Sequence, residues 1–324
     1  MTQENGHLTI LDRLVAVNLN VAIWSARKKL TAADFGGAEL PPEDLASLGS
    51  KKICDPERLR IFGTLKARAV ARLESLGIRF LGGWAIPEDQ ATEVHEMLLK
   101  LRDEFLAAKE VFLTSYDQAI QDWVDKHPGW ERLIADSPVS ADQVRNRLGF
   151  KWQLFKVAGP DKQDATSENL TSEIEALGQT LFGEVAAEAK TIWQKVYAGK
   201  TEVSHKALSP LKNLHRKLTG LSFVEPRVAP VADLIDAALK SVPRRGFISG
   251  SHLVMLQGLV TMLRSPDLLI EHGQKVIEGH SPDQLLNTLV QSNSQEEAEQ
   301  DCPLPLPLPA SDSTPQFVDS LGLW

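Results

Sequence analysis

VAVNLNVAI, residues 15–23, alternates large apolar side chains with alanine and asparagine. Valine, leucine or isoleucine occupies every second position from Val15 to Ile23, and the smaller or polar residues fill the positions between them. Strict period-two alternation with β-branched residues is typical of a strand that is buried on one face. The segment therefore predicts a half-buried strand near the start of an ordered domain.

Two later segments resemble this strand. IRFLGGWAI, residues 78–86, is interrupted by Gly82 and Gly83, where a bulge or a turn fits. FKWQLFKV, residues 150–157, alternates again from Phe150. We expect a small sheet of about three strands, and antiparallel pairing is favoured because such a sheet can leave one face in water.

The segments between and after these strands predict helices. Asp55, Pro56 and Glu57 form a helix start, with a capping carboxylate, a proline in the first turn and an acidic side chain near the positive end of the dipole. The helix is expected to run from about Pro56 to Leu76 and to end at Gly77. Mainly helical structure with a small sheet, of the α+β class, is therefore the predicted fold.

After Pro87 the sequence predicts one long helix to about Lys126, which would be about 60 Å long at 1.5 Å per residue. Its apolar stripe has spacings of four and three, close to a heptad seam: Val94, Leu98, Leu101, Phe105, Ala108, Phe112 and Ala119.

A second striped helix is expected from near Ser167 and continues toward Leu218, with a break or kink at Gly199 or Pro210. The two long helices can pair as an antiparallel coiled-coil hairpin, or each can pack in a globular helical body. The periodicity supports both arrangements equally. Residues 227–290 predict a further helical block with breaks at prolines and glycines.

Composition places the chain among globular proteins, with 43% apolar and 24% charged residues. Its two cysteines, Cys54 and Cys302, lie in segments of different character, so a disulfide framework is not expected. We expect the protein to occupy a reducing compartment. No run approaches the roughly 18 apolar residues that span a bilayer, and MTQENGHLTI at the start is unlike a signal peptide. We expect a cytoplasmic protein that does not enter a membrane.

Residues 292–324 are acidic and rich in proline, with six acidic residues and no lysine or arginine. Removing these six charges from the total of −8 leaves −2, so the rest of the chain is nearly neutral. Such a composition predicts a disordered tail after two folded regions, 1–160 and 161–291. The tail ends in QFVDSLGLW, where Phe317, Leu321 and Trp324 share one face if the segment becomes helical, as in short motifs that bind a partner's groove.

Sequence motifs for catalysis are missing. No phosphate-binding loop, dinucleotide fingerprint or nucleophile elbow occurs. Cys54 follows Lys51 and Lys52 and precedes a helix start, which favours a reactive thiol, although a buried structural cysteine is the simpler interpretation. His272 and His280 can share a helix face but are separated by glycines. We therefore expect no enzyme activity, cofactor or metal.

Positive charge is concentrated between residues 195 and 217, where six basic side chains face one acidic side chain, Glu202. These residues predict a contact with nucleic acid, with an acidic protein partner or with the chain's own tail, unless they form an ordinary solvated helix face. Smaller clusters at 27–29 and 51–52 carry less weight. The six basic residues, called the basic stripe below, are Lys195, Lys200, Lys206, Lys212, Arg216 and Lys217.

Longer phrases of the sequence resemble a known family. LVAVNLNVAIWSARKKL, ELPPEDLASLGSKKICDPERLRIFGTLKARA, GIRFLGGWAIPED and HPGWERLI are similar to bacterial proteins grouped as domain of unknown function 3150. The resemblance is strong over residues 8–160 and looser beyond them. It implies an origin in mobile elements and proteobacterial genomes, and genes beside a MoxR-like AAA+ ATPase and a von Willebrand factor A protein. It implies no catalytic residues.

Two classes of function follow from these patterns. The first is a non-enzymatic interaction or adaptor protein in which long helices act as a spacer and the tail recruits a protein partner, an AAA+ ATPase or a von Willebrand factor A protein. The second is a nucleic-acid-binding accessory factor that uses the basic stripe. An enzyme whose active site forms only on folding is a third alternative. Oligomeric state is not determined by the sequence.

Overall fold

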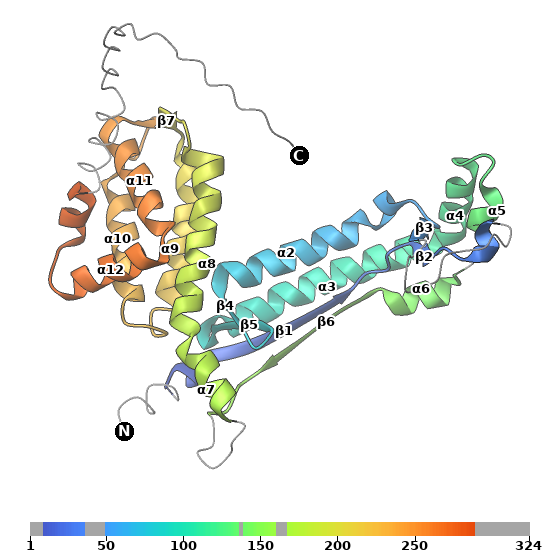
Figure 1. Ribbon diagram of the computed structural model, residues 1–324, viewed down its shortest axis with the longest axis horizontal. Helices are drawn as coiled ribbons and strands as arrows, with labels where there is room; N and C mark the ends of the chain where they lie inside the picture. Colours follow the sequence, from blue (N-terminus) through green and yellow to red (C-terminus); the bar gives the residue numbers. More distant parts are fainter. Residues whose placement is uncertain (1–8, 36–48, 136–138, 160–166, 289–324) are drawn as a thin grey trace, which may run out of the picture.

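The computed structural model describes residues 9–35, 49–135, 139–159 and 167–288. These residues form a helical body and a long arm that projects from it, with a group of short elements at the far end of the arm (Figure 1). The chain is mainly helical with small antiparallel sheets, as predicted. We use the names body for residues 167–288, arm for 14–22, 56–114 and 149–155, and tip for 24–35, 49–55, 115–135 and 139–148.

The arm contains the main sheet, whose strand order is β4-β5-β1-β6 and whose neighbours are all antiparallel. It has four strands where about three were expected, because the segment 78–86 forms two strands. Leu81 and Gly82 both have positive φ, 48° and 74°, which is the geometry of a two-residue hairpin turn. The strands are β1 (Leu14–Ala22), β4 (Ile78–Phe80), β5 (Gly83–Pro87) and β6 (Gly149–Phe155).

The strand β1 is buried on both faces at its start and on one face farther along. Leu14 packs in the core of the body, whereas Val15 and Val17 pack in the core of the arm. Beyond Val17, the asparagines and the alanine are exposed, while Leu19 and Val21 pack against the arm core. The predicted alternation therefore holds for the second half of the strand, because the body covers the other face only near the start.

The helix α2 (Arg60–Leu76) follows a 3-10 turn, η2 (Pro56–Leu59), and packs in the arm core. The Asp55 carboxylate accepts a hydrogen bond from the Glu57 amide (3.0 Å), and the helix ends at Gly77, both as predicted. A side chain at Gly77 is excluded because a Cβ would lie 2.6 Å from the carbonyl oxygen of Ala85. The predicted helix boundaries are confirmed.

The helix α3 (Ala91–Thr114) runs antiparallel to α2 along the arm (Figure 1), and its predicted stripe faces the arm core. The helix does not continue unbroken to Lys126, as the sequence predicted. Ser115 interrupts it: the Ser115 amide donates to the carbonyls of both Val111 and Phe112, and its hydroxyl donates to Val111 as well. The second helix, α4 (Tyr116–Asp125), then turns away into the tip.

Within the described residues, the body is built from six main helices. The predicted break after the second striped helix lies at Gly199 (φ 65°), and Pro210 instead lies in the first turn of α9. The stripe of α8 packs in the body core and that of α3 in the arm core, so the two do not pair as a coiled-coil hairpin. The helices are α7 (Ser167–Glu175), α8 (Leu177–Ile192), α9 (Leu208–Gly220), α10 (Val228–Ser241), α11 (Gly250–Leu263) and α12 (Pro266–Ile277).

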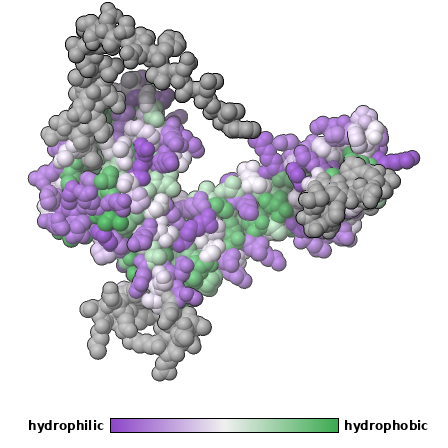
Figure 2. Space-filling model, viewed as in Figure 1, coloured by the Kyte–Doolittle hydropathy of each residue, from purple (hydrophilic) through white to green (hydrophobic). Residues whose placement is uncertain are grey.

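Shorter elements complete the three parts, and a turn of π-helix, η4 (Trp193–Tyr197), extends α8. Figure 2 shows apolar residues along the arm, whereas hydrophilic residues predominate in the visible part of the tip. The arm also contains η3 (Glu88–Gln90). The body contains β7 (Glu202–Val203), η5 (His205–Ala207) and β8 (Ile248–Ser249). The tip contains β2 (Arg27–Lys29), η1 (Ala32–Phe35), β3 (Ser50–Lys52), α5 (Glu131–Ala135) and α6 (Ala141–Arg147).

Among residues 9–35, 49–135, 139–159 and 167–288, no single helix is long and apolar enough to cross a membrane. Only α11 and α12 taken together reach that length, and they are bent by 109° relative to each other. The apolar face of α11, including Leu256 and Leu259, is buried in the body core.

Replacing Leu98 with alanine is expected to lower the free energy of unfolding by about 2–5 kcal/mol, because its side chain is fully buried in the arm core. The matched change Leu106→Ala removes the same atoms from the same helix at a side chain that is 42% exposed, and should cost no more than about 0.5 kcal/mol. Urea denaturation measures both. Equal costs would contradict the burial assigned to this face of α3.

Candidate interaction site

The predicted basic stripe does not lie on one continuous helix. Lys195 belongs to η4, Lys200 follows the break at Gly199, and Lys206 lies in η5. All three side chains are exposed. The remaining members, Lys212, Arg216 and Lys217, lie on α9, so the stripe spans a break, a 3-10 turn and two helical segments.

Lys217 is not part of an accessible cationic face. Its side chain is only 4% exposed, and its ammonium donates to the Glu184 carboxylate on α8 (2.7 Å) and to the Glu74 carbonyl near the end of α2 (2.8 Å). The expectation of a partner contact is therefore corrected for this residue. Lys217 instead joins the body to the arm, because its two acceptors belong to different parts.

The same cluster links the main sheet to the body. The other oxygen of the Glu184 carboxylate accepts from the Arg79 amide in β4 (2.8 Å), and the Arg79 guanidinium pairs with Glu74 (2.6 Å). Burial raises the pKa of Glu188, although the nearby Lys217 ammonium opposes that shift. The cluster thus contains partly buried ion pairs, in which loss of one charged side chain leaves its partner without a counter-charge.

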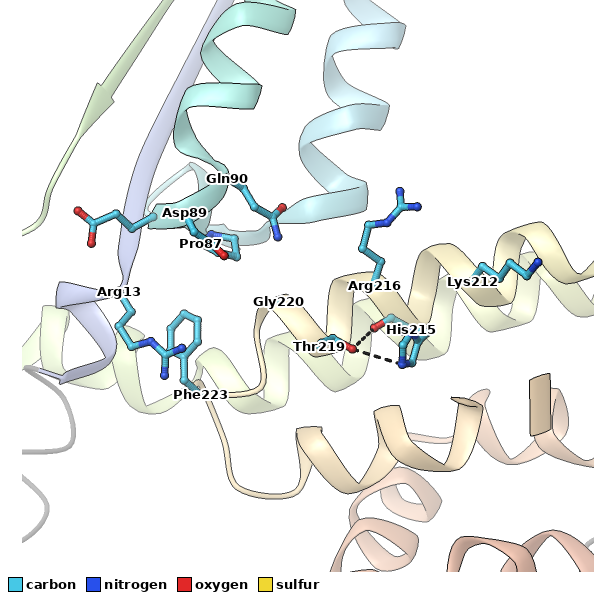
Figure 3. Close-up of a pocket in the computed structure, with 11 residues that line it drawn as sticks. Arg13, Pro87, Asp89, Gln90, Lys212, His215, Arg216, Thr219, Gly220 and Phe223 are labelled. Carbon is cyan, nitrogen blue, oxygen red and sulfur yellow. Dashed lines mark hydrogen bonds between the residues drawn. The ribbon is translucent and has the colours of Figure 1, made fainter. Parts of the chain in front are cut away.

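Lys212 and Arg216 border a cavity of about 810 Å³ between α9 and the arm (Figure 3). They are four residues apart on one face of α9, and Arg13 contributes a third cation from the segment before β1. The Arg13 guanidinium lies 4.1 Å from the centre of the Phe223 ring, which restricts its position. The lining thus holds three cations against two carboxylates, those of Glu88 and Asp89, and keeps a small positive excess.

The opposite wall of this cavity is the turn from β5 into η3 (Figure 3). Glu88 pairs with Lys156 (2.6 Å), and the Gln90 side-chain oxygen is buried without a hydrogen-bond partner among the described residues. Gly220 allows this wall to approach α9, because a Cβ there would lie 2.9 Å from the Gln90 amide nitrogen. Sequence patterns missed the cavity, since its walls come from segments far apart in the chain.

His215 and Thr219 are the side chains in this cavity that most resemble a base and a nucleophile. The Thr219 hydroxyl lies 3.4 Å from the His215 Nε2 but donates to the His215 backbone carbonyl at 2.8 Å. A hydroxyl whose proton is held by its own helix is not activated by the imidazole. His215 and Thr219 therefore do not form a base–nucleophile pair in this structure.

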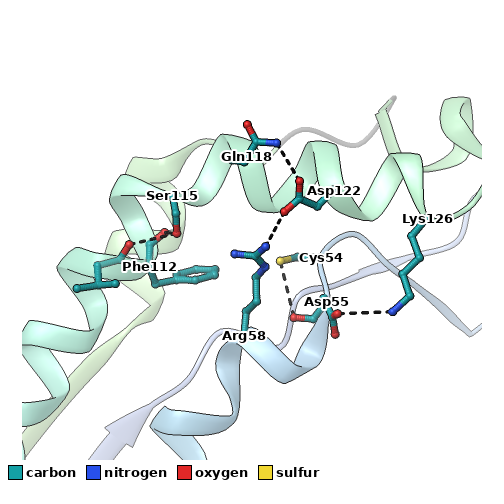
Figure 4. A network of polar contacts seen from close by, with 9 residues as sticks. Cys54, Asp55, Arg58, Phe112, Ser115, Gln118, Asp122 and Lys126 are labelled. Atoms are coloured by element: carbon teal, nitrogen blue, oxygen red, sulfur yellow. Dashed lines mark hydrogen bonds and ion pairs between the residues drawn. The ribbon is translucent and has the colours of Figure 1, made fainter.

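Cys54 is a buried structural residue in the part of the tip next to α2. Its side chain is fully buried, and burial raises the pKa of its thiol to about 11, far from the lowered pKa of a reactive cysteine. Around it, Asp55 pairs with Lys126 (3.8 Å) and Arg58 pairs with Asp122 (2.6 Å), as Figure 4 shows. These contacts hold the start of α2 against α4.

The two candidate histidines both contact backbone carbonyls of α12. His272 Nδ1 lies 2.9 Å from the Leu268 carbonyl, and His280 Nδ1 lies 3.0 Å from the Lys275 carbonyl. In the described part of the chain, no group of three His, Cys, Asp or Glu residues can hold a metal ion. The predicted terminal motif of Phe317, Leu321 and Trp324 lies outside the described residues.

The variant Lys217→Met is expected to lower the free energy of unfolding by about 2–3 kcal/mol. The substitution keeps the length of the side chain but leaves the partly buried Glu184 carboxylate without its cation. Adding Glu184→Gln should restore part of the loss. Lys212→Met removes an exposed cation from the same helix and should change stability by less than about 0.5 kcal/mol. Thermal and urea denaturation check all three; equal effects at 212 and 217 would contradict the buried contact.

Comparison with known proteins supports the family resemblance. No curated protein and no solved structure matches the chain at a significant level. Residues 11–265 match the family described as "Protein of unknown function (DUF3150)". The match covers the arm, the tip and the body as far as the end of α11. Because it spans well over half of the sequence, the chain belongs to the DUF3150 family.

Proposed function

We propose that this protein is a non-enzymatic adaptor whose arm holds two binding ends at a fixed separation. The observation that carries the proposal is the membership of β1 in two cores, those of the body and of the arm. An arm that pivots on the body must break one of these cores. With 24 residues in α3, the rigid part extends about 36 Å beyond the body.

The cavity between α9 and the arm supports a binding role. Arg13, Lys212 and Arg216 around its opening are suited to a carboxylate or a phosphate, and a cavity at the contact of two rigid parts is a common place for a ligand or peptide. An acidic peptide from a protein partner fits this charge.

The proposed partners are a MoxR-like AAA+ ATPase and a von Willebrand factor A protein encoded beside the gene, in a bacterial mobile element and in the cytoplasm. The support is the family membership together with the gene neighbourhood that the family resemblance implies. Phe317, Leu321 and Trp324 are the proposed contacts, since their spacing of four and three forms one apolar face when the segment becomes helical on binding.

Mutation of the terminal motif tests this proposal. Replacing Phe317, Leu321 and Trp324 with alanine should weaken binding to the purified ATPase or von Willebrand factor A protein by at least about tenfold, because buried aromatic anchors dominate such contacts. The melting temperature should not change. Binding is measured by titration calorimetry and by co-elution on gel filtration.

The matched control is alanine at Gln316, Asp319 and Ser320, which keeps the apolar face and should bind as the wild type does. Failure of the wild-type protein to bind either partner would reject the adaptor with these partners. Normal binding by the alanine variant of the motif would show that the motif is not the contact, without rejecting the adaptor function.

The second candidate is a nucleic-acid-binding accessory factor that uses the basic stripe. It is supported by the exposure of five of the six side chains, all except Lys217. Lys206, Lys212 and Arg216 replaced by glutamine should then weaken DNA or RNA binding and reduce its dependence on salt, as measured by fluorescence anisotropy. Lys217 is left unchanged because its loss would destabilise the fold. Unaltered binding would reject the stripe as the contact.

A further inference from the structure

Two segments of the body that contain no aspartate or glutamate meet at its smallest sheet. The segments are residues 203–224 and 237–266. β7 and β8 pair antiparallel, with Val203 opposite Ile248, so the start of the first segment lies against the middle of the second. Figure 1 shows β7 at the end of the body away from the main sheet. We call this region the β7–β8 end.

The loop before β8 presents two arginines and an aromatic ring to solvent. Arg244 and Arg245 are exposed, and within the described residues no carboxylate lies within ion-pair distance of either guanidinium. Ile248 is buried in the body core, so Phe247, one position earlier in the extended chain, points the other way and is 66% exposed. Gly246 has a φ of 90°, a left-handed conformation that suits glycine and turns the loop.

Two lysines of the basic stripe flank the same sheet. The β7–β8 register, continued by one pair, places Phe247 beside Ser204, two residues before Lys206. Lys200 lies two residues before β7. Both lysine side chains are exposed, and neither forms an ion pair among the described residues. The cations of the β7–β8 end are therefore Lys200, Lys206, Arg244 and Arg245.

Hydrogen bonds from buried or half-buried side chains hold the backbone at both lysines. The Gln257 side-chain amide of α11 donates to the carbonyls of Tyr197 (3.3 Å) and Lys200 (3.2 Å). The buried Tyr197 hydroxyl donates to the carbonyl of Ala207 (3.0 Å), the residue after Lys206. The lysines thus lie on backbone that is tied to the body core.

The charge at this end stays positive when the nearby acidic side chains are counted. Asp236 of α10 pairs with Lys240 (2.6 Å), so these two charges cancel. Glu202 of β7 and Asp233 of α10 remain, and 4 − 2 leaves an excess of two positive charges among the described residues of these segments. The six acidic residues of 292–324 lie outside the described residues, and the full-length chain used in the test includes them.

We infer that the β7–β8 end binds single-stranded nucleic acid, with Arg244 and Arg245 on phosphates and Phe247 stacked on a base. Cations that follow the backbone and an exposed ring that stacks on a base are the two parts of such sites. A duplex covers its base faces by its own stacking and has no use for the ring. A protein interface has an apolar centre, whereas the other exposed large apolar side chains among the described body residues lie on α12.

This site extends the second candidate function, on which it rests, from the basic stripe to a loop outside it. The test uses full-length variants and labelled oligothymidylate and oligouridylate of about 15 nucleotides, with a DNA duplex of the same length for comparison. Fluorescence anisotropy follows binding from about 50 mM salt upward. Melting temperatures establish that each variant is folded.

The charge variant carries Arg244→Gln and Arg245→Gln. It should bind the single strands at least about tenfold more weakly at low salt, and its plot of log affinity against log salt should be flatter by about 1.4, from two lost phosphate contacts at about 0.7 each. Its control carries Lys66→Gln and Lys100→Gln, which remove two exposed cations from the arm and should bind like the wild type.

The ring variant is Phe247→Ala. It should bind at least about fivefold more weakly, the lower end of the loss of one stacked base, with the salt dependence unchanged because no cation is removed. Phe247→Trp should keep the affinity, since tryptophan also stacks. Phe155→Ala, which removes an exposed ring from β6, is the control and should bind like the wild type.

Four results would overturn the assignment. Absence of wild-type binding to any of the three probes at low salt would reject both this site and the second candidate function. Wild-type affinity in both the charge and the ring variant would reject this site and leave the basic stripe as a candidate. Tighter binding of the duplex than of either single strand would reject a stacked base. Polyglutamate that competes as well as unlabelled oligothymidylate would favour an acidic protein partner instead.

Discussion

The first residues of β1 belong to two hydrophobic cores, those of the body and of the arm. The rest of the structure depends on this shared strand. Leu14 faces the body, and Val15 and Val17 face the arm. The neighbouring hairpin repeats the division, with Ile78 in the body core and Ile86 in the arm core. A single sheet is thus covered by different helices on its two faces. Apolar burial on both sides disfavours independent movement of body and arm, because about 25 cal/mol is lost for each Å² that is re-exposed.

Electrostatics reinforces the same contact. The ammonium of Lys217 lies where helices from body and arm meet, and it donates to a partly buried carboxylate and to a backbone carbonyl. A buried ion pair adds little net stability but is costly to break. Its effect is therefore specificity: it favours one arrangement of α2, α8 and α9 over alternatives with the same apolar area. Apolar burial, which is not directional, and the hydrogen-bonded ion pair, which is directional, together set the orientation of the arm relative to the body.

Such a construction keeps two cationic surfaces apart. The cavity beside α9 offers three cations near the body, and the β2–β3 ribbon offers four exposed cations at the other end of the arm. Packing restricts the cations in both places: the partly buried Phe223 ring lies against Arg13, and the buried Trp24 and Ile53 anchor the ribbon.

Local patterns in the sequence determined most of the secondary structure. The helix start at Asp55, its end at Gly77 and the stripe of α3 follow from capping and periodicity, which involve residues a few positions apart. Tertiary structure alone decided that the stripes of α3 and α8 belong to different cores, that Lys217 is buried, and that the basic clusters at 27–29 and 51–52 form one ribbon. Each of these depends on contacts between segments distant in the chain, and periodicity states that a face is apolar or charged without stating what covers it.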